Sequence, residues 1–215
     1  MNTLELFSGT QSFSKGIKRS PLKINQVITV DILDKFHPTH CVDILNWDYK
    51  IYPEGYFNTI WGSPPCTEYS KAKTRGKRNL EFADSLVKKT FEIIDYFKPD
   101  SWIVENVGTG LLPDRMDYIR PNLSSFIADY CAYGKPYRKR TIFWSNKNLI
   151  LETCKGIGFC DKMEGRRHLA NVGDSTPIYP IKINSVWQKN SIPDTLIDSI
   201  IQQLNEARPI SGLDK

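Results

Sequence analysis

The stretch that decides the fold runs over residues 57–70 and reads Phe57-Asn58-Thr59-Ile60-Trp61-Gly62-Ser63-Pro64-Pro65-Cys66-Thr67-Glu68-Tyr69-Ser70. Its first half is an apolar, strand-like run, and its second half is a loop that contains two successive prolines. Proline fixes its own φ and restricts the residue before it, so Cys66 stands on a stiff loop at a strand end. Open α/β sheets place their chemistry at the carboxyl ends of strands. The stretch therefore predicts an α/β domain that presents a reactive thiol, in preference to a buried packing cysteine.

Strand-like and helix-like segments alternate on both sides of this loop. Residues 11–18 and 80–97 have the apolar spacing of helices, and Pro193 starts a last amphipathic helix. Strands are expected at residues 3–7, 26–30, 41–44, 57–61, 101–107, 126–130 and 141–145. This alternation favours an α/β fold with a mostly parallel sheet.

Length and cysteine content are typical of an intracellular globular protein. The chain has 215 residues, enough for one sizeable core, and five cysteines spread along it. An odd number of scattered cysteines argues against a disulfide framework and for a reducing compartment. We see no membrane span and no signal peptide, so we expect no membrane partner and a location in the cytoplasm or nucleoid of a bacterial host.

Positive charge is gathered in two clusters. The formal net charge is +5, and one cluster directly follows Cys66 while the other precedes the strand expected at 141–145. Basic clusters beside a reactive group favour a phosphate-bearing partner. The clusters are Lys71, Lys73, Arg75, Lys77 and Arg78, and Lys135, Arg138, Lys139 and Arg140.

Three kinds of chemical group lie at element edges. Cys66 is a nucleophile, Glu105 lies in an apolar strand that reads Trp-Ile-Val-Glu-Asn-Val, and Arg138 and Arg140 are anion-binding groups. Together they suggest covalent catalysis on a polar heterocycle. The alternatives are a surface ion pair for Glu105 and solvated strand positions for the arginines.

The first three strands carry the features of a nucleoside site. The first ends in a loop of small residues, which lets a ligand approach the backbone and the following helix N-terminus. Asp31 ends the second strand and can accept hydrogen bonds from a ribose diol, and Asp43 follows the third and can accept one from an adenine amine. Each acid alone is more often a cap or turn residue, but their order ahead of the Pro-Pro-Cys loop favours a ligand site.

In these motifs the chain resembles the cytosine-5 DNA methyltransferases, most closely the short phage- and virus-type members without a large recognition domain. The Pro-Pro-Cys and Glu-Asn-Val motifs are the specific ones, and all the matches follow the family's order from residue 4 to about 193. The matching segments are Leu6-Phe7-Ser8-Gly9, Gly62 to Cys66, Glu105-Asn106-Val107, Tyr133 to Arg140, and Asn190-Ser191-Ile192-Pro193.

The resemblance implies a Rossmann-like methyltransferase fold that uses S-adenosylmethionine and leaves S-adenosylhomocysteine. Cys66 would add to carbon-6 of a cytosine in DNA, with nearby basic residues lowering its pKa. Glu105 would hold the N3 and amine edge of the base in protonated form, and Arg140 with Arg138 would bind the O2 edge. In a duplex the cytosine must be flipped out, with the basic loop after Cys66 closing over the phosphates.

The resemblance also assigns two sets of contacts and three segments. Residues 1–145 form the catalytic and cofactor-binding domain, 146–180 a small irregular insert, and 181–215 a C-terminal segment whose helix packs back on the first. The cofactor contacts are Phe7, Ser8, Gly9, Thr10, Asp31, Ile32, Asp43, Ile44, Ser63, Pro64 and Asn190. The substrate contacts are Pro65, Ser70, Lys71, Lys73, Arg75 and Tyr137.

The chain departs from the family pattern in several places, one of them between Pro136 and Arg138, where Tyr137 stands alone and the usual glutamine is missing. Gln11-Ser12 stands where a glycine pair is usual, so side chains narrow the cofactor site, and Lys189 also replaces a glycine. Only about 50 residues separate the arginine motif, which ends at Arg140, from the last motif, which begins at Asn190, too few for a target-recognition domain. Either short loops or a partner protein supply specificity, or the substrate is not ordinary duplex DNA.

The sequence leaves alternatives open for metal binding and for function. No metal is assigned, although Cys154, Cys160 and His168 in the insert are zinc candidates. The Cys-x5-Cys spacing is not a standard knuckle, and no fourth ligand is apparent. The main expectation is a DNA cytosine-5 methyltransferase. The alternatives are the same chemistry on RNA, and a cofactor-binding homologue without turnover.

Overall fold

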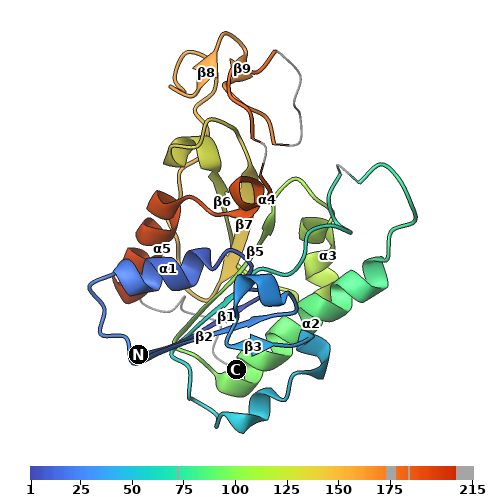
Figure 1. Ribbon diagram of the computed structural model, residues 1–215, viewed down its shortest axis with the longest axis vertical. Coiled ribbons are helices and arrows are strands. Elements are labelled where there is room, and N and C mark those ends of the chain that lie inside the picture. Colours follow the sequence, from blue (N-terminus) through green and yellow to red (C-terminus); the bar gives the residue numbers. More distant parts are fainter. Residues whose placement is uncertain (72, 173–177, 184, 207–215) are drawn as a thin grey trace.

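A seven-stranded sheet organises the molecule (Figure 1). The structure is a computed structural model that describes residues 1–71, 73–172, 178–183 and 185–206. The strand order is β3-β2-β1-β4-β5-β7-β6, and β7 runs antiparallel between β5 and β6 while the first five strands are parallel. The strands are β1 (Asn2–Leu6), β2 (Gln26–Asp31), β3 (His40–Cys41), β4 (Thr59–Gly62), β5 (Ser101–Val107), β6 (Ser125–Asp129) and β7 (Arg140–Ser145). This arrangement confirms the α/β, mostly parallel fold predicted from the sequence.

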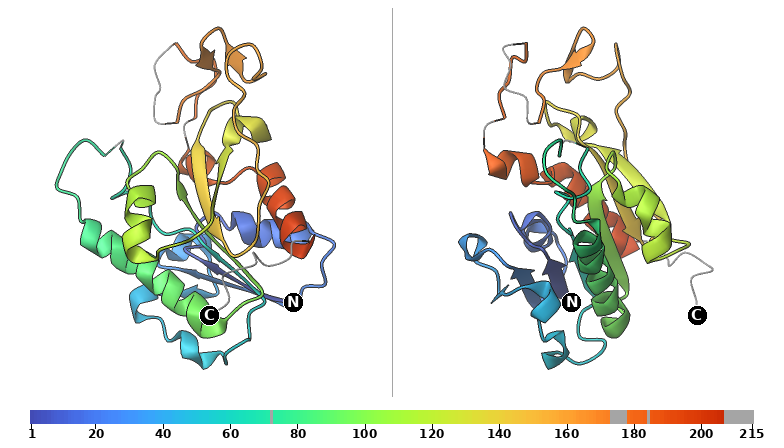
Figure 2. Two further views of the ribbon diagram at one scale, coloured as in Figure 1. Left: turned by 180° about the vertical axis from the view of Figure 1, so that it is seen from behind. Right: turned by 90° about the vertical axis from the view of Figure 1, so that its right-hand side faces the viewer.

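Helices cover both faces of the sheet (Figures 1 and 2). On one face α2 and α3 pack over Leu4, Ile60 and Val104, and on the other α1 and α5 pack over Trp61 and Ile103. Successive strand residues point to opposite faces, so neighbours such as Ile60 and Trp61 belong to different cores. The helices are α1 (Ser12–Arg19), α2 (Leu80–Phe97), α3 (Leu112–Ile119), α4 (Val186–Asn190) and α5 (Asp194–Glu206).

The longest helix has the bounds that its sequence predicts. The Asn79 side chain accepts a hydrogen bond from the Phe82 N–H at 3.1 Å and so satisfies a free donor of the first turn of α2. At the other end Lys98 has a left-handed φ of 48°, and Pro99 follows. A proline cannot continue the hydrogen-bond ladder, so the helix ends there.

The third strand is shorter than predicted. The sequence predicts a strand over residues 41–44, whereas β3 is His40–Cys41 and a 3₁₀ turn, η2 (Ile44–Asn46), follows. The Asp43 carboxylate accepts a hydrogen bond from the Leu45 N–H at 3.0 Å, which caps that turn. Three further 3₁₀ turns, η1 (Asp34–Phe36), η3 (Tyr49–Ile51) and η4 (Tyr130–Tyr133), also carry the chain between strands.

The insert expected at 146–180 projects beyond the end of β6 and β7 (Figure 1). It contains a short hairpin of β8 (Met163–Glu164) and β9 (Arg167–His168). Residues 173–177 of this insert, and residues 184 and 207–215 of the expected C-terminal segment, lie outside the described part of the chain. Among the helices that the structure describes, none has both the length and the apolar character needed to cross a bilayer.

Candidate active site

A cavity of about 590 Å³ opens at the carboxyl ends of β1, β2, β4 and β5. Every cofactor contact expected from the sequence lies in its wall, together with Pro65, Cys66 and Glu105. The cavity volume is in the range that small-molecule sites occupy. The cofactor residues in the wall are Phe7, Ser8, Gly9, Thr10, Asp31, Ile32, Asp43, Ile44, Ser63, Pro64 and Asn190.

The loop between β1 and α1 has an unusual backbone. Phe7, Gly9 and Gln11 have φ values of 54°, 42° and 57°, in the left-handed region. Side chains disfavour that region by roughly 1–2 kcal/mol per residue, so the surroundings must hold Phe7 and Gln11 there. Asp31 supplies part of that support, because its carboxylate accepts hydrogen bonds from the N–H groups of Gly9 and Leu33, both at 2.8 Å.

The polar groups of this loop fit a polar ligand. The Ser8 hydroxyl is buried and has no hydrogen-bond partner within the described part of the chain, although Ser8 lines the cavity. A buried polar atom without a partner is costly unless a ligand or water satisfies it. The hydroxyl and the remaining acceptor capacity of Asp31 therefore suit the polar edges of a nucleoside.

Gln11 does not narrow the cavity as the sequence suggested. Its side-chain amide donates to the backbone oxygens of Phe36 at 2.7 Å and His37 at 3.4 Å, and Gln11 itself does not line the cavity. Ser12 does line the cavity, and its hydroxyl accepts a hydrogen bond from the Ile192 N–H at 3.2 Å. That contact joins the start of α1 to the segment that carries Asn190.

The Pro-Pro-Cys loop is held from two sides. The Asn106 side chain, at the end of β5, donates to the Pro64 carbonyl at 2.9 Å. On the other side, the Cys66 carbonyl accepts from the Tyr69 N–H at 3.0 Å, and the buried Tyr69 hydroxyl donates to Asp84 at 2.9 Å. The asparagine of the Glu-Asn-Val motif therefore positions the loop that carries the thiol.

The electrostatic surroundings of Cys66 differ from the sequence expectation. The residue is exposed at the cavity, yet burial of its thiol raises the pKa, and the nearby Glu105 carboxylate raises it further. Lys139 is the cation that opposes this rise. The sequence predicts that nearby basic residues lower this pKa, and Lys139 does act in that direction. Desolvation outweighs the Lys139 charge, so the pKa of Cys66 is raised overall.

Glu105 is buried in the cavity wall. Burial raises its pKa, while the Lys139 charge and a hydrogen bond with Ser63 act in the opposite direction. A carboxyl group with a raised pKa can keep its proton near neutral pH and donate a hydrogen bond. Its position at one edge of the cavity suits a donor to a ring nitrogen.

The two expected arginines bind an aspartate of the neighbouring strand. Arg140 makes two contacts with the Asp129 carboxylate at 2.8 and 3.0 Å, and Arg138 contacts the same carboxylate at 3.2 Å. Neither arginine lines the cavity, whereas Lys139 between them does. Side chains along an extended segment alternate between its two sides, so this alternation is the sequence signal that could have identified Lys139.

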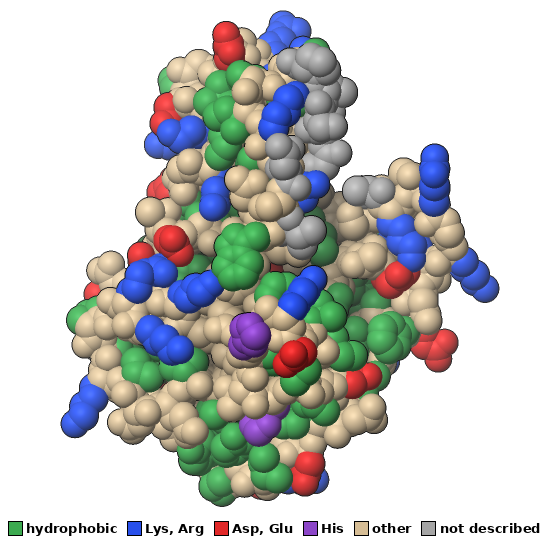
Figure 3. Space-filling view, in the orientation of Figure 1, with side chains coloured by type: hydrophobic (Ala, Val, Ile, Leu, Met, Phe, Trp, Pro, Cys, Tyr) green, Lys and Arg blue, Asp and Glu red, His purple; other side chains and the backbone are tan. Residues whose placement is uncertain are grey.

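The remaining expected substrate contacts, apart from Pro65, lie outside the cavity wall. Ser70, Lys71, Lys73 and Arg75 occupy the loop after Cys66, and Tyr137 is buried with its hydroxyl donating to the Gln188 carbonyl at 2.9 Å. Figure 3 shows this loop as an arm at the right, with basic side chains on its surface and a notch between it and the insert above.

Two basic residues build the arm, and others are displayed on it. Lys73 pairs with Glu68 at 2.6 Å, and the Arg78 guanidinium donates to the carbonyls of Glu68, Ser70 and Lys73. Lys71, Arg75 and Lys77 are exposed. The first two residues therefore fix the shape of the arm, while the exposed three are placed to meet an anion.

A protein-family model matches the N-terminal part of the chain. The family is described as C-5 cytosine-specific DNA methylase, and the match covers residues 1–128. Among curated proteins, the probable DNA (cytosine-5)-methyltransferase of Frog virus 3 (isolate Goorha) is 36% identical over 179 residues. That alignment covers 76% of this chain and 79% of the viral protein.

Solved methyltransferases share the fold. A methyltransferase of Entamoeba histolytica, EhMeth, superimposes with a TM-score of 0.61 at 16% identity, over 96% of this chain and 98% of that one. A putative DNA modification methyltransferase encoded within an E. coli prophage gives a TM-score of 0.51 at 18% identity. The latter alignment covers 67% of this chain and 46% of the prophage protein.

Proposed function

The chain belongs to the C-5 cytosine-specific DNA methylase family, and on that premise we propose that it methylates carbon-5 of cytosine in DNA through a covalent Cys66 adduct. One observation carries the proposal. Cys66 and Glu105, from two neighbouring strands, line the same cavity as the residues of the β1–α1 loop. A thiol, a carboxyl group and a nucleoside-sized site are thereby brought within one cavity.

The cavity residues divide the chemistry between them. The Cys66 thiolate adds to carbon-6 of the cytosine, which pushes electron density to carbon-5. Glu105, in protonated form, donates to N3 and offsets the negative charge that develops in the ring. S-adenosylmethionine, when bound, supplies the methyl group as an electrophile. Loss of the carbon-5 proton to solvent then allows the carbon-6–sulfur bond to break and returns the Cys66 thiolate.

Lys139 is the cation of this site in our proposal. It acts on both Cys66 and Glu105, and it lies in the cavity wall that the two arginines do not reach. A fixed positive charge favours the thiolate over the thiol, and it also favours a ring that is gaining negative charge. Arg138 and Arg140 support it indirectly, by pairing with Asp129 on the other side of the segment.

The target base must leave the duplex to reach this cavity. Cys66 lines the cavity, whereas the reacting carbons of a paired cytosine lie within the base stack, so we propose that the base is flipped out of the duplex. The arm after Cys66 displays three exposed basic residues that are placed to bind the phosphates on either side of a flipped cytosine. Binding to the backbone fixes position but carries no sequence information.

Trapping on 5-fluorocytosine tests the proposal. Fluorine at carbon-5 cannot leave as a proton does, so a DNA duplex with this base should remain bound to Cys66 after methyl transfer. We expect a covalent complex that resists denaturing electrophoresis and requires S-adenosylmethionine. Cys66→Ser should abolish it, whereas Cys41→Ser, which removes an exposed thiol on β3, should leave it intact.

Comparing several nucleic acids as substrates distinguishes the proposed function from its alternatives. Duplex DNA, single-stranded DNA and transfer RNA are compared for adduct formation and for methyl transfer from labelled S-adenosylmethionine. Adduct formation on RNA alone would replace DNA as the substrate. Cofactor binding by calorimetry with no adduct on any nucleic acid would show a binding homologue without turnover.

A further inference from the structure

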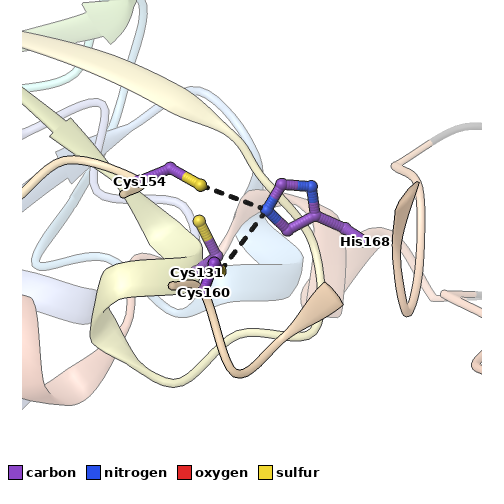
Figure 4. Close-up of side chains that lie close together, drawn as sticks. All are labelled: Cys131, Cys154, Cys160 and His168. Atoms are coloured by element: carbon purple, nitrogen blue, oxygen red, sulfur yellow. Dashed lines mark hydrogen bonds between the residues drawn. The ribbon is translucent and has the colours of Figure 1, made fainter. Parts of the chain in front are cut away.

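Four potential metal ligands converge where the insert meets the body of the molecule. The thiols of Cys131, Cys154 and Cys160 and a ring nitrogen of His168 all lie within 4.8 Å of one another. The side chains come from three segments, η4, the chain after β7 and the β8–β9 hairpin, and Figure 4 shows them turned toward a common point. Convergence of four groups of this kind is the arrangement that a structural metal site needs.

The two distances from His168 to cysteine sulfurs match those around a tetrahedral zinc ion. The His168 Nε2 atom is 3.5 Å from the Cys154 sulfur and 3.7 Å from the Cys160 sulfur. Zinc binds cysteine sulfur at about 2.3 Å and histidine nitrogen at about 2.0 Å, so tetrahedral geometry separates the two ligand atoms by about 3.5 Å. The ligand atoms are thus already close to where an ion would hold them.

We propose that Cys131, Cys154, Cys160 and His168 bind one Zn²⁺ as a structural Cys3His site. Cys131 is the fourth ligand that the Cys-x5-Cys segment does not contain. Four protein ligands fill a tetrahedral shell and leave no position for water or substrate. The site is therefore a structural centre, separate from the cavity that contains Cys66 and Glu105.

A zinc ion at this site would stabilise the insert. The insert contains a hairpin of two residues per strand, and most of its residues around the cysteines are exposed, so it has little core of its own. Small segments without a core commonly depend on a metal or a disulfide. A zinc ion would join this insert to Cys131, which is buried beside β6.

The same centre stabilises the arginine pair. The backbone N–H of Cys154 donates to the Asp129 carboxylate at 2.9 Å, and that carboxylate binds Arg140 and Arg138. Asp129 lies two residues before Cys131, so the aspartate is tied to one ligand through the chain and to another through a hydrogen bond. Zinc thereby fixes the acceptor that orients the segment carrying Lys139.

Metal analysis tests the proposal on the full-length chain. The protein is purified under reducing conditions without chelator, and its zinc content is measured by mass spectrometry. We expect about one equivalent of zinc per chain. Cys131→Ser and His168→Ala should lose it, Cys41→Ser should keep it, and His168→Cys should also keep it, because a fourth thiolate restores the ligand set.

Titration with Co²⁺ uses the wild-type protein, so this test does not depend on the folding of a variant. Titration of metal-free wild-type protein with Co²⁺ should produce the absorption bands of a tetrahedral thiolate complex, and Zn²⁺ should displace them. A chain that carries no zinc, binds none on titration and gives no such bands would overturn the proposal. Zinc that remains in Cys131→Ser would overturn the assignment of the fourth ligand.

Discussion

At the scale of single residues, the Lys139 charge opposes the rise that burial causes in the pKa of Cys66. Replacement by Gln removes the only positive charge in the described cavity wall while keeping most of the side-chain volume. Burial and Glu105 would then raise the pKa of Cys66 with only a backbone hydrogen bond opposing them, and a smaller fraction of the thiol would be ionised. We expect the pH profile of adduct formation to move to higher pH.

A quenched adduct assay over pH 6–9 measures this shift. Lys71→Gln removes the same charge from the exposed arm and serves as the control, since Lys71 does not line the cavity. An unchanged profile in Lys139→Gln would mean that the thiolate is favoured by some other group.

The ionisation of Glu5 makes the free energy of unfolding depend on pH. It is buried under the β1–α1 loop and accepts hydrogen bonds from the N–H groups of Phe13 and Ser14, yet burial raises its pKa from 4.5 to about 7. The protonated form therefore stabilises the native state below about pH 4.5. That contribution is lost as the pH rises toward 7, and amounts to roughly 2–4 kcal/mol.

Urea unfolding over pH 4.5–8 tests this expectation. The free energy of unfolding of the wild type should fall relative to that of Glu5→Gln, which cannot release a proton. Glu81→Gln, an exposed site on α2, should follow the wild type. Equal slopes for wild type and Glu5→Gln would show that Glu5 is ionised throughout.

Single residues also mark the limit of sequence reasoning. Local order along the chain was enough to predict that Cys66, Glu105 and the expected cofactor contacts lie together, because parallel strands end at one edge of a sheet, and these residues do line one cavity. Lys139 and Cys131 were missed because their roles depend on the direction of a side chain and on a segment folded back from elsewhere. The alternation of side chains around Lys139 gives a hint of its direction, whereas nothing in the spacing of the cysteines points to Cys131.

At the scale of elements, the contact between α1 and α5 depends on Gly16. A methyl group at this position would lie 2.2 Å from Ile197 Cγ2 and 2.9 Å from Ile201 Cδ1. Alanine is the better helix former by about 1 kcal/mol, but such a clash forces the two helices apart. We expect Gly16→Ala to destabilise the protein by about 1–3 kcal/mol, or several degrees in melting temperature.

A double-mutant cycle identifies the cause of that destabilisation. Ile197→Ala alone should destabilise the protein by leaving a cavity, but combined with Gly16→Ala it should cost less than the sum of the two. If the two destabilisations were strictly additive, Gly16 would be needed for its backbone conformation and not for the packing of α1 on α5.

The elements that were predicted well are the ones with long, regular patterns. The helix over residues 80–97 and the strand over 101–107 have the predicted bounds, because apolar periodicity and Pro99 define them locally. The helix α3 was missed. It has only two buried residues, Leu112 and Met116, and so offers almost no periodic signal.

At the scale of the whole molecule, the predicted α/β class and the family resemblance are both confirmed. The insert was harder to foresee. Its conformation depends on contacts between segments that are distant in sequence, with the Cys154 N–H on Asp129 and the thiols beside Cys131. Patterns read within one segment contain no information on such pairings, so only the composition of the insert could be described in advance.

The distribution of charge over the molecule makes a prediction about DNA binding. Lys71, Arg75 and Lys77 are exposed on the arm beside the notch in Figure 3, whereas Lys18, Lys23 and Lys50 are exposed on other parts of the surface, outside the arm. Changing either trio to Gln lowers the net charge by the same amount. Only the first trio should weaken binding, because counterion release requires contact with phosphate.

The salt dependence of the dissociation constant distinguishes direct phosphate binding from bulk charge. Removing one basic side chain that binds a phosphate should reduce the slope of log K against log salt by about 0.9. The slope should therefore fall by about 2 to 3 in the arm variant and by about 0 in the control variant. Fluorescence anisotropy with a short duplex between 50 and 300 mM salt, roughly the range over which such slopes are measured, gives both values. If the slope falls equally in the two variants, net charge governs binding and the arm does not bind DNA. If it falls in the arm variant alone, the arm supplies the backbone grip that a larger recognition domain would otherwise provide.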